Sequence, residues 1–285
     1  NGHTSWIPNV MQYNMQVNKS DTVQFYFNTS ELPDFRGQGI TYELYLPVYN
    51  GVRWLSVGTD ASSSFQFVEG SKERPIVVYG TSIAHGASAS RPGLIWSTRL
   101  KRRYECPVIN LGFSGNGKME NALFDALGEI DARAYLIDCV PNCAGLSAQE
   151  FESRLRYGIE KLRSVSKAPI VFMEGQFFDH PSALVHSTNY HKQLQKDTIQ
   201  YKVVQELIGK GVKDLYYITR NELGLTADDM IEGVHPNDIG MMKYEQAYAR
   251  VLDQALVGAD TMRQYTPCTQ RRDGYDWIER HNSII

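Results

Sequence analysis

The chain has 285 residues, a formal net charge of −3 and 42% hydrophobic residues. This length allows one large domain or a medium domain with a small one, and the ordinary composition indicates a globular protein. The slightly acidic balance gives no electrostatic reason to expect a nucleic acid or an anionic membrane as partner. No apolar run approaches the roughly 18 residues that a membrane-spanning helix needs, so we expect no membrane span.

The first 72 residues form a region rich in aromatic and β-branched residues and interrupted by turn formers. Partial alternation of apolar and polar residues predicts short strands at 23–27, 42–46 and 64–68. Short strands separated by turns are typical of antiparallel sheets, so we expect a small β-sandwich-like accessory domain over 1–72.

From Pro75 onward, apolar runs alternate with helical patterns. The runs suited to buried parallel strands lie at 76–79, 108–111, 134–140, 170–173 and 215–218. Hydrophobic residues at three- and four-residue steps, together with breakers, predict helices at about 119–130, 151–162, 190–208 and 238–256. The alternation predicts an α/β domain with a mostly parallel sheet that helices cover on both faces.

Ligands of such a sheet bind beyond the carboxyl ends of its strands, so the loops after strands are where chemistry is expected. Ser82 follows the first strand at the start of a predicted helix, where free backbone N–H groups favour developing negative charge. The loop 112–117 after the second strand is rich in glycine and lets the backbone approach a ligand closely. It has neither the GxGxxG spacing nor the Walker lysine followed by Ser or Thr that nucleotide-binding loops show. Asn142 follows the third strand, either as an amide donor to an oxyanion or as a turn former.

The fourth loop carries Glu232 and His235, three residues apart. A carboxylate at this spacing can fold back and accept a hydrogen bond from the histidine Nδ1–H. That arrangement leaves Nε2 free to take a proton from a hydroxyl group. An isolated histidine before a proline is more often structural, so the pair gains its meaning from the other three loops.

The set Ser, Gly, Asn and acid-x-x-His, in this order, resembles the four blocks of the SGNH hydrolase family. The stretches 79–93, 110–117 and 138–142 and the tail 270–281 are similar to a bacterial GDSL-like branch with a small N-terminal β domain. Residues 39–45 only approximate the Gly-x-Asp-Leu-Tyr signature of that branch. The resemblance implies a three-layer α/β/α, flavodoxin-like domain with a five-stranded sheet over 73–262 and a C-terminal extension over 263–285.

The same resemblance implies ester hydrolysis, with Ser82 as nucleophile and His235 as general base. The oxyanion would be held by the backbone N–H groups of Ser82 and Gly115 and by the side chain of Asn142. Gly115 is preferred to Gly112 because it lies five residues after Asn110, as the family glycine does.

Glu232 is the expected acid of the triad, although the family usually has Asp at this position. A backbone carbonyl could orient His235 instead, which would leave a Ser–His dyad. His85 and Arg91 flank the nucleophile helix and could contact substrate, or serve only as surface and capping residues.

One further segment contains Asp179, His180, His186 and His191 and could suggest a metal site. His186 and His191 are five residues apart, a spacing that one helix face does not favour, so we expect no metal and no cofactor. The four cysteines are too few for a disulfide scaffold, and we expect buried thiols, with one or two disulfides as the alternative.

The family branch favours a carbohydrate esterase that removes acetyl or another small acyl group from a glycan, in a secreted or periplasmic protein. The sequence begins at Asn1 without a signal-like segment, as expected for a chain whose targeting segment has been removed. Aromatic residues available for a sugar are Trp6, Tyr42, Tyr45, Tyr49 and Trp54. The alternatives are a lipid-directed esterase or thioesterase, and a non-catalytic glycan-binding protein on a hydrolase fold.

Overall fold

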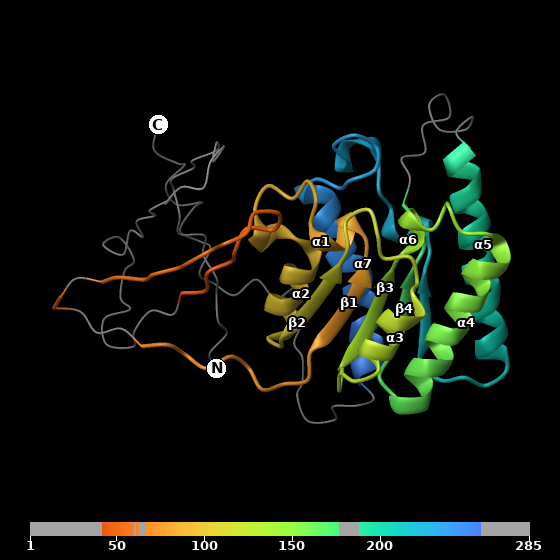
Figure 1. Ribbon diagram of the computed structural model, residues 1–285, viewed down its shortest axis with the longest axis horizontal. Helices are drawn as coiled ribbons and strands as arrows, with labels where there is room; N and C mark the ends of the chain where they lie inside the picture. Colours follow the sequence, from red (N-terminus) through yellow and green to blue (C-terminus); the bar gives the residue numbers. More distant parts are fainter. Residues whose placement is uncertain (1–41, 60, 63–65, 177–187, 258–285) are drawn as a thin grey trace, which may run out of the picture. The chain divides into compact units, whose positions relative to one another are not determined.

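Figure 1 shows the computed structural model, which describes residues 42–59, 61–62, 66–176 and 188–257. The chain divides into two compact units, 1–44 and 45–285. Most of the first unit lies outside the described residues, and no strand is assigned over 42–46. The β-rich domain expected over 1–72 stays a prediction, and the extension expected over 263–285 is likewise outside the described part of the chain.

The sheet has five parallel strands, which confirms the predicted α/β architecture. They are β1 (Ile76–Gly80), β2 (Val108–Gly112), β3 (Ala134–Asp138), β4 (Ile170–Met173) and β5 (Leu215–Ile218), in the order β2-β1-β3-β4-β5. The run predicted at 134–140 is too long, because β3 ends at Asp138. Pro141 lacks the N–H that a strand ladder requires, and it lies in a short 3₁₀ turn, η2 (Val140–Asn142).

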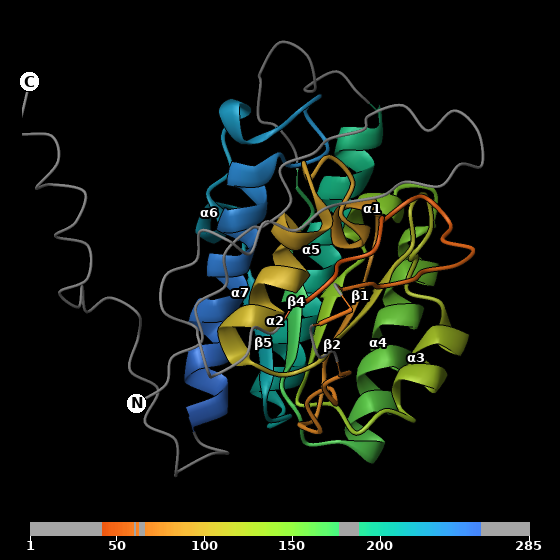
Figure 2. The same ribbon diagram turned by 90° about the vertical axis from the view of Figure 1, so that its left-hand side faces the viewer.

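Helices cover both faces of the sheet (Figure 2). One face packs against α1 (Ser82–His85), α2 (Trp96–Tyr104), α6 (Arg220–Leu223) and α7 (Asp238–Val257). The other face packs against α3 (Asn121–Leu127), α4 (Ala148–Val165) and α5 (Thr188–Gly209). Short 3₁₀ turns, η1 (Pro92–Leu94) and η3 (Ala227–Asp229), complete the described elements. The three layers form because buried parallel strands must be covered on both sides.

The helix predicted over 119–130 forms over a shorter range than expected. The structure has only α3, and Met119 before it adopts φ 57°, which a right-handed helix does not allow. The Met119 side chain is fully buried from a loop position. The spacing of Met119 therefore reports burial, whereas Leu123 and Leu127 of the same pattern lie in α3 as predicted.

The strand order places a topological switch point between β1 and β3. The chain leaves β1 towards β2 on one side and leaves β3 towards β4 on the other, so the loops after β1 and β3 diverge above the sheet. A crevice at such a point is where ligands of open α/β sheets bind. Ser82 follows β1 and Asn142 follows β3, so the fold brings these two predicted site residues to the same crevice.

Cys106, Cys139 and Cys143 are buried free thiols, as expected, while Cys268 lies outside the described residues. Within the described ranges, no helix combines the length and the apolar character needed to cross a bilayer.

Candidate active site

The turn between β1 and α1 presents Ser82. At Gly80 a Cβ atom would lie 2.7 Å from the Ala84 Cβ and 2.9 Å from the Asp138 carbonyl oxygen, so only glycine lets the strand turn directly into the helix. Thr81 caps α1 through its side-chain oxygen, which accepts a hydrogen bond of 3.3 Å from the Ile83 N–H. Ser82 is then the first residue of the helix, half-buried.

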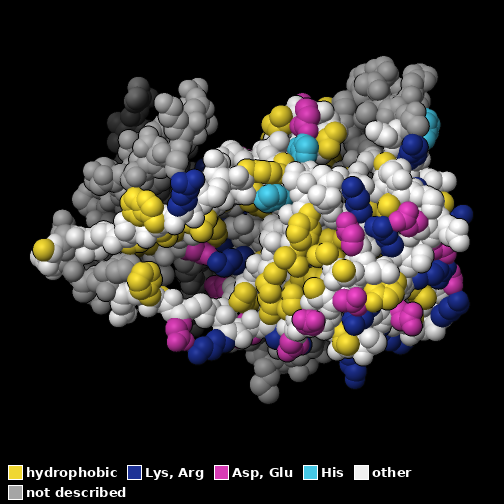
Figure 3. All heavy atoms as spheres, viewed as in Figure 1, with side chains coloured by type: hydrophobic (Ala, Val, Ile, Leu, Met, Phe, Trp, Pro, Cys, Tyr) yellow, Lys and Arg dark blue, Asp and Glu magenta, His cyan; other side chains and the backbone are white. Residues whose placement is uncertain are grey.

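A tight loop carries the predicted base and acid. The Ile231 N–H donates to the His235 carbonyl oxygen at 2.9 Å, and Met230 forms a β-bridge with Pro236, so the segment between them is a closed turn. Gly233 at φ 84° permits the reversal. This segment lies before α7, at the carboxyl edge of the sheet at the top of Figure 1. Figure 3 shows a histidine and an acidic side chain exposed along that edge, with hydrophobic side chains beside them.

Ser82, His235 and Glu232 are in contact in the order that the sequence predicts. The Ser82 Oγ lies 2.8 Å from the His235 Nε2, and the His235 Nδ1 is hydrogen-bonded to the Glu232 Oε1. A carboxylate can only accept, so Nδ1 carries the proton in this pair. In the neutral imidazole Nε2 is then the acceptor for the Ser82 hydroxyl proton, which is the tautomer a general base requires. The exposed Glu232 side chain reaches the ring despite its extra methylene.

The nucleophile loop and the histidine loop are also tied together. The Ser90 N–H, after α1, donates to the Asp238 Oδ1 at 2.9 Å. The neighbouring Asn237 side chain accepts from the N–H groups of Ile239 and Gly240, at 2.9 and 3.1 Å, and so caps α7. The start of α7 therefore fixes the histidine loop relative to the loop that follows Ser82.

The glycine-rich loop after β2 lies directly against the nucleophile turn. A Cβ at Gly112 would be 2.2 Å from the backbone nitrogen of His85, and one at Gly117 would be 2.2 Å from the Gly80 carbonyl oxygen. The Phe113 N–H donates to that same Gly80 oxygen at 2.9 Å. Gly115 lies between them, exposed, at φ 72° and with open space around it. The loop thus approaches the turn through backbone atoms, as an oxyanion site would require.

Asn142 is joined to this loop. Its side-chain Nδ2 donates to the Asn116 carbonyl oxygen, in the residue next to Gly115. A side-chain amide has two N–H groups, so one remains for a substrate oxygen. No acceptor for the Ser82 N–H lies within the described ranges. The three expected oxyanion donors therefore sit on one contiguous set of loops.

Asn110 has a structural role that the sequence did not reveal. Its Nδ2 donates to the Ala84 carbonyl oxygen at 2.7 Å and to the Ser97 Oγ at 2.9 Å, while its Oδ1 accepts from the Gly112 N–H at 2.9 Å. One side chain thereby connects α1, α2 and the glycine-rich loop. Its place as a polar residue inside an otherwise apolar strand was the available signal.

Asp138 was also missed as a residue of interest. It pairs in register with Gly80 beneath the nucleophile turn, and its side chain is fully buried. Neither carboxyl oxygen has a hydrogen-bond partner among the described residues. The buried hydroxyls of Tyr244 and Tyr248 also have no hydrogen-bond partner among these residues. Burial, and secondarily the charge of Asp197, raises the pKa of Asp138 from 3.8 to about 7. A polar residue closing an otherwise apolar strand was the sequence signal.

The remaining candidates have other surroundings. The His85 Nε2 lies 3.0 Å from the Val48 carbonyl oxygen, and its ring centroid lies 4.3 Å from that of Tyr49. Arg91 is exposed and precedes η1. Asp179, His180 and His186 lie outside the described residues, whereas His191 lies on α5. Among the residues that can be described, no three potential ligands form a metal-binding group.

Comparisons with known proteins bear on the family and the fold. Residues 73–253 match the GDSL-like lipase/acylhydrolase family. A candidate GDSL-like lipase from Bacteroides ovatus is 34% identical, with a TM-score of 0.57 over 65% of this chain and 54% of that one. The salicylyl-acyltransferase SsfX3, from a tetracycline biosynthetic pathway, is 18% identical and shows the same fold, with a TM-score of 0.55 over 68% of this chain and 58% of that one. This chain thus matches little more than half the length of either structure. No curated protein matches the sequence. The family match covers most of the chain, and the chain belongs to the GDSL-like lipase/acylhydrolase family, as its sequence motifs predict.

Proposed function

We propose that this protein is a serine ester hydrolase that removes small acyl groups, with acetyl as the leading case, from carbohydrates. The observation that carries the proposal is the contact of 2.8 Å between the Ser82 Oγ and the His235 Nε2, with Glu232 on the far side of the imidazole ring. A nucleophile that contacts a base, which in turn contacts an orienting acid, is the arrangement that activates a serine.

In the proposed mechanism, the Ser82 Oγ forms a bond to the ester carbonyl carbon while its proton passes to the His235 Nε2. The carbonyl oxygen, now an oxyanion, accepts hydrogen bonds from the backbone N–H groups of Ser82 and Gly115 and from the Asn142 amide. The imidazolium then protonates the departing alcohol, which leaves an acyl group on Ser82. Water, deprotonated by His235, attacks this ester and releases the acid and the free serine.

The carbohydrate part of the proposal is supported by the family branch and by aromatic surface close to α1. Tyr49 is 56% exposed and packs against His85, one turn of helix after Ser82. Trp54, in the same segment, is 63% exposed. Exposed aromatic rings present an apolar face together with a polar edge, which suits a sugar ring.

A lipid-directed esterase is the second candidate, because apolar side chains surround the catalytic loops. Ile231 and Val234 flank Glu232 in the histidine loop and are 63% and 47% exposed, and Phe113 in the glycine-rich loop is 38% exposed. Such side chains could contact an acyl chain longer than acetyl. Preference for acyl length separates the two candidates.

The test is hydrolysis of 4-nitrophenyl acetate, butyrate and octanoate by the wild type, Ser82→Ala and the exposed-serine control Ser153→Ala. We expect turnover by the wild type and the control, none above background by Ser82→Ala, and the highest kcat/KM for acetate. Acetate release from acetylated xylo-oligosaccharides then tests the carbohydrate part. Octanoate preference would move the assignment to the lipid-directed esterase. A wild type no faster than Ser82→Ala would contradict catalysis and favour glycan binding without chemistry.

A further inference from the structure

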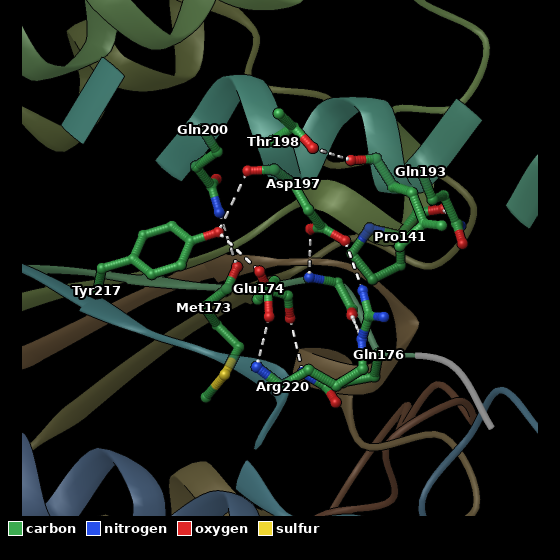
Figure 4. A network of polar contacts seen from close by, with 12 residues as sticks. Pro141, Met173, Glu174, Gln176, Gln193, Asp197, Thr198, Gln200, Tyr217 and Arg220 are labelled. Atoms are coloured by element: carbon green, nitrogen blue, oxygen red, sulfur yellow. Dashed lines mark hydrogen bonds and ion pairs between the residues drawn. The ribbon is translucent and has the colours of Figure 1, made fainter. Parts of the chain in front are cut away.

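A network of polar contacts fixes α5 to the carboxyl end of β4, beside the proposed site (Figure 4). On α5, the Asp197 carboxylate accepts from the Gly175 N–H at 2.7 Å and from the Arg220 Nη2 at 2.7 Å. Arg220 also donates to the Gly175 carbonyl oxygen at 2.9 Å. Farther along the helix, the Gln200 Nε2 donates to the Met173 carbonyl oxygen at 3.0 Å.

Asp197 is held at the centre of this network by burial and close packing. Its side chain is almost completely buried, so the ion pair with Arg220 is largely shielded from solvent. A Cβ at Gly175 would lie 2.8 Å from the Val140 Cγ1 and 3.2 Å from the Asp197 Oδ1. Glycine therefore allows α5, β4 and the turn after β3 to meet at this point.

One turn before Asp197, the same face of α5 reaches the turn that carries Asn142. Gln193 lies four residues before Asp197, a spacing that aligns two side chains on one helix face. Its Nε2 donates to the Pro141 carbonyl oxygen at 2.7 Å. Pro141 immediately precedes Asn142 in η2, and Figure 4 shows Gln193 directed from the helix to Pro141.

The contacts form a continuous path from α5 to the loops that carry the expected oxyanion donors. Asp197 anchors α5, Gln193 holds the Pro141 carbonyl, and Asn142 extends from the same turn to the Asn116 carbonyl. The peptide between Pro141 and Asn142 is planar and stiff, so fixing the Pro141 carbonyl restricts the backbone of Asn142. A side chain of α5 thus holds the backbone from which the Asn142 amide extends.

We propose that Gln193 is a positioning residue, which acts through Asn142 to place an oxyanion donor. The inference rests on the proposed function, in which Asn142 binds the oxyanion. Removing an oxyanion donor costs about 10²–10³-fold in kcat. Loosening the donor while keeping it should cost less, about tenfold, with little change in KM because ground-state binding does not use it.

The kinetic test uses a double-mutant cycle in the wild-type and Asn142→Ala backgrounds. Gln193→Ala and Gln193→Glu both remove the donor, and Gln205→Ala, at an exposed position of α5, is the matched control. We expect about a tenfold loss of kcat for the Gln193 variants in the wild-type background, in line with the partial loss of one donor. We expect no further loss in the Asn142→Ala background and no change for the control. Equal losses in both backgrounds would overturn the proposal, since they indicate a general structural effect.

A second readout does not depend on turnover. The side-chain NH₂ resonances of Asn142, identified by their disappearance in Asn142→Ala, report the environment of the amide in ¹H–¹⁵N spectra. They should shift in Gln193→Ala and stay in place in Gln205→Ala. Unchanged resonances would overturn the positioning role. If Ser82→Ala shows that the wild type has no ester hydrolysis, the proposed function fails by itself, and the spectra still decide whether Gln193 positions Asn142.

Discussion

Replacing Asp138 with Asn tests whether the buried carboxyl group beneath the nucleophile turn has a raised pKa. Asp138 has a pKa raised from 3.8 to about 7, first by burial and then by the charge of Asp197. The hydroxyls of Tyr244 and Tyr248 interact electrostatically with Asp138, and burial raises their pKa values well above the ordinary range. They stay neutral near pH 7 and supply no compensating charge.

The sign of the effect follows from the direction of this shift. Because the folded-state pKa is raised, the folded protein binds the Asp138 proton more tightly than the unfolded chain does. The associated stability is fully present below the unfolded pKa of 3.8 and is lost as pH rises to about 7. A shift of this size corresponds to a loss on the order of 4 kcal/mol in the free energy of unfolding.

Asp138→Asn removes the titration and keeps the shape of the side chain. Its stability relative to the wild type should rise by about 3 kcal/mol between about pH 5 and about pH 8, since most of the loss falls in this window. Urea unfolding at several pH values measures the difference, and Asp131→Asn, the same change at an exposed side chain, is the control. A difference between Asp138→Asn and the wild type that stays constant over this range would refute the reasoning.

Three further predictions concern the site. Glu232→Ala should lower kcat by about 10²-fold. This loss is smaller than the roughly 10⁴-fold loss known for a buried triad acid, because Glu232 is half exposed. Steady-state kinetics measure the loss, and a negligible loss would indicate a Ser–His dyad instead of this triad. Gly117→Ala should destabilise the fold by about 1–3 kcal/mol more than Gly115→Ala, since both glycines have φ 72° but only the former meets a backbone oxygen, at 2.2 Å. Equal unfolding free energies would contradict this contact. Asn142→Ala should lower kcat about 10²–10³-fold with KM nearly unchanged; a change in KM alone would place Asn142 in ground-state binding.

Much of the fold followed from patterns that burial imposes on a sequence. Strands β4 and β5 coincide with apolar runs that have no polar interruption, so their limits were predicted without error. The helix predicted over 119–130 begins only at Asn121, because Met119 is a buried loop residue that mimics helical spacing, and its positive φ leaves no mark in a single sequence. The end of β3 failed because Val140 is apolar and buried although it belongs to the following turn.

The proposed site was predictable where chemistry depends on local spacing. Glu232 and His235 meet because three residues and a glycine close one turn, which the sequence displays. The importance of Asp138 and Gln193 comes from neighbours that other elements bring, so the sequence showed at most that Asp138 is a polar residue closing an apolar strand. Asp138 matters through its burial beside Gly80 of β1, and Gln193 through a carbonyl 52 residues away in the chain.

The most direct test of the central claim is covalent labelling of the nucleophile. The wild type is treated with a fluorophosphonate, and the adduct is located by mass spectrometry of peptides, with His235→Ala as the comparison. We expect one adduct per chain, on Ser82, formed much more slowly in His235→Ala because the serine then lacks its base. An adduct on another residue, or no adduct on a chain that still hydrolyses esters, would contradict the central claim.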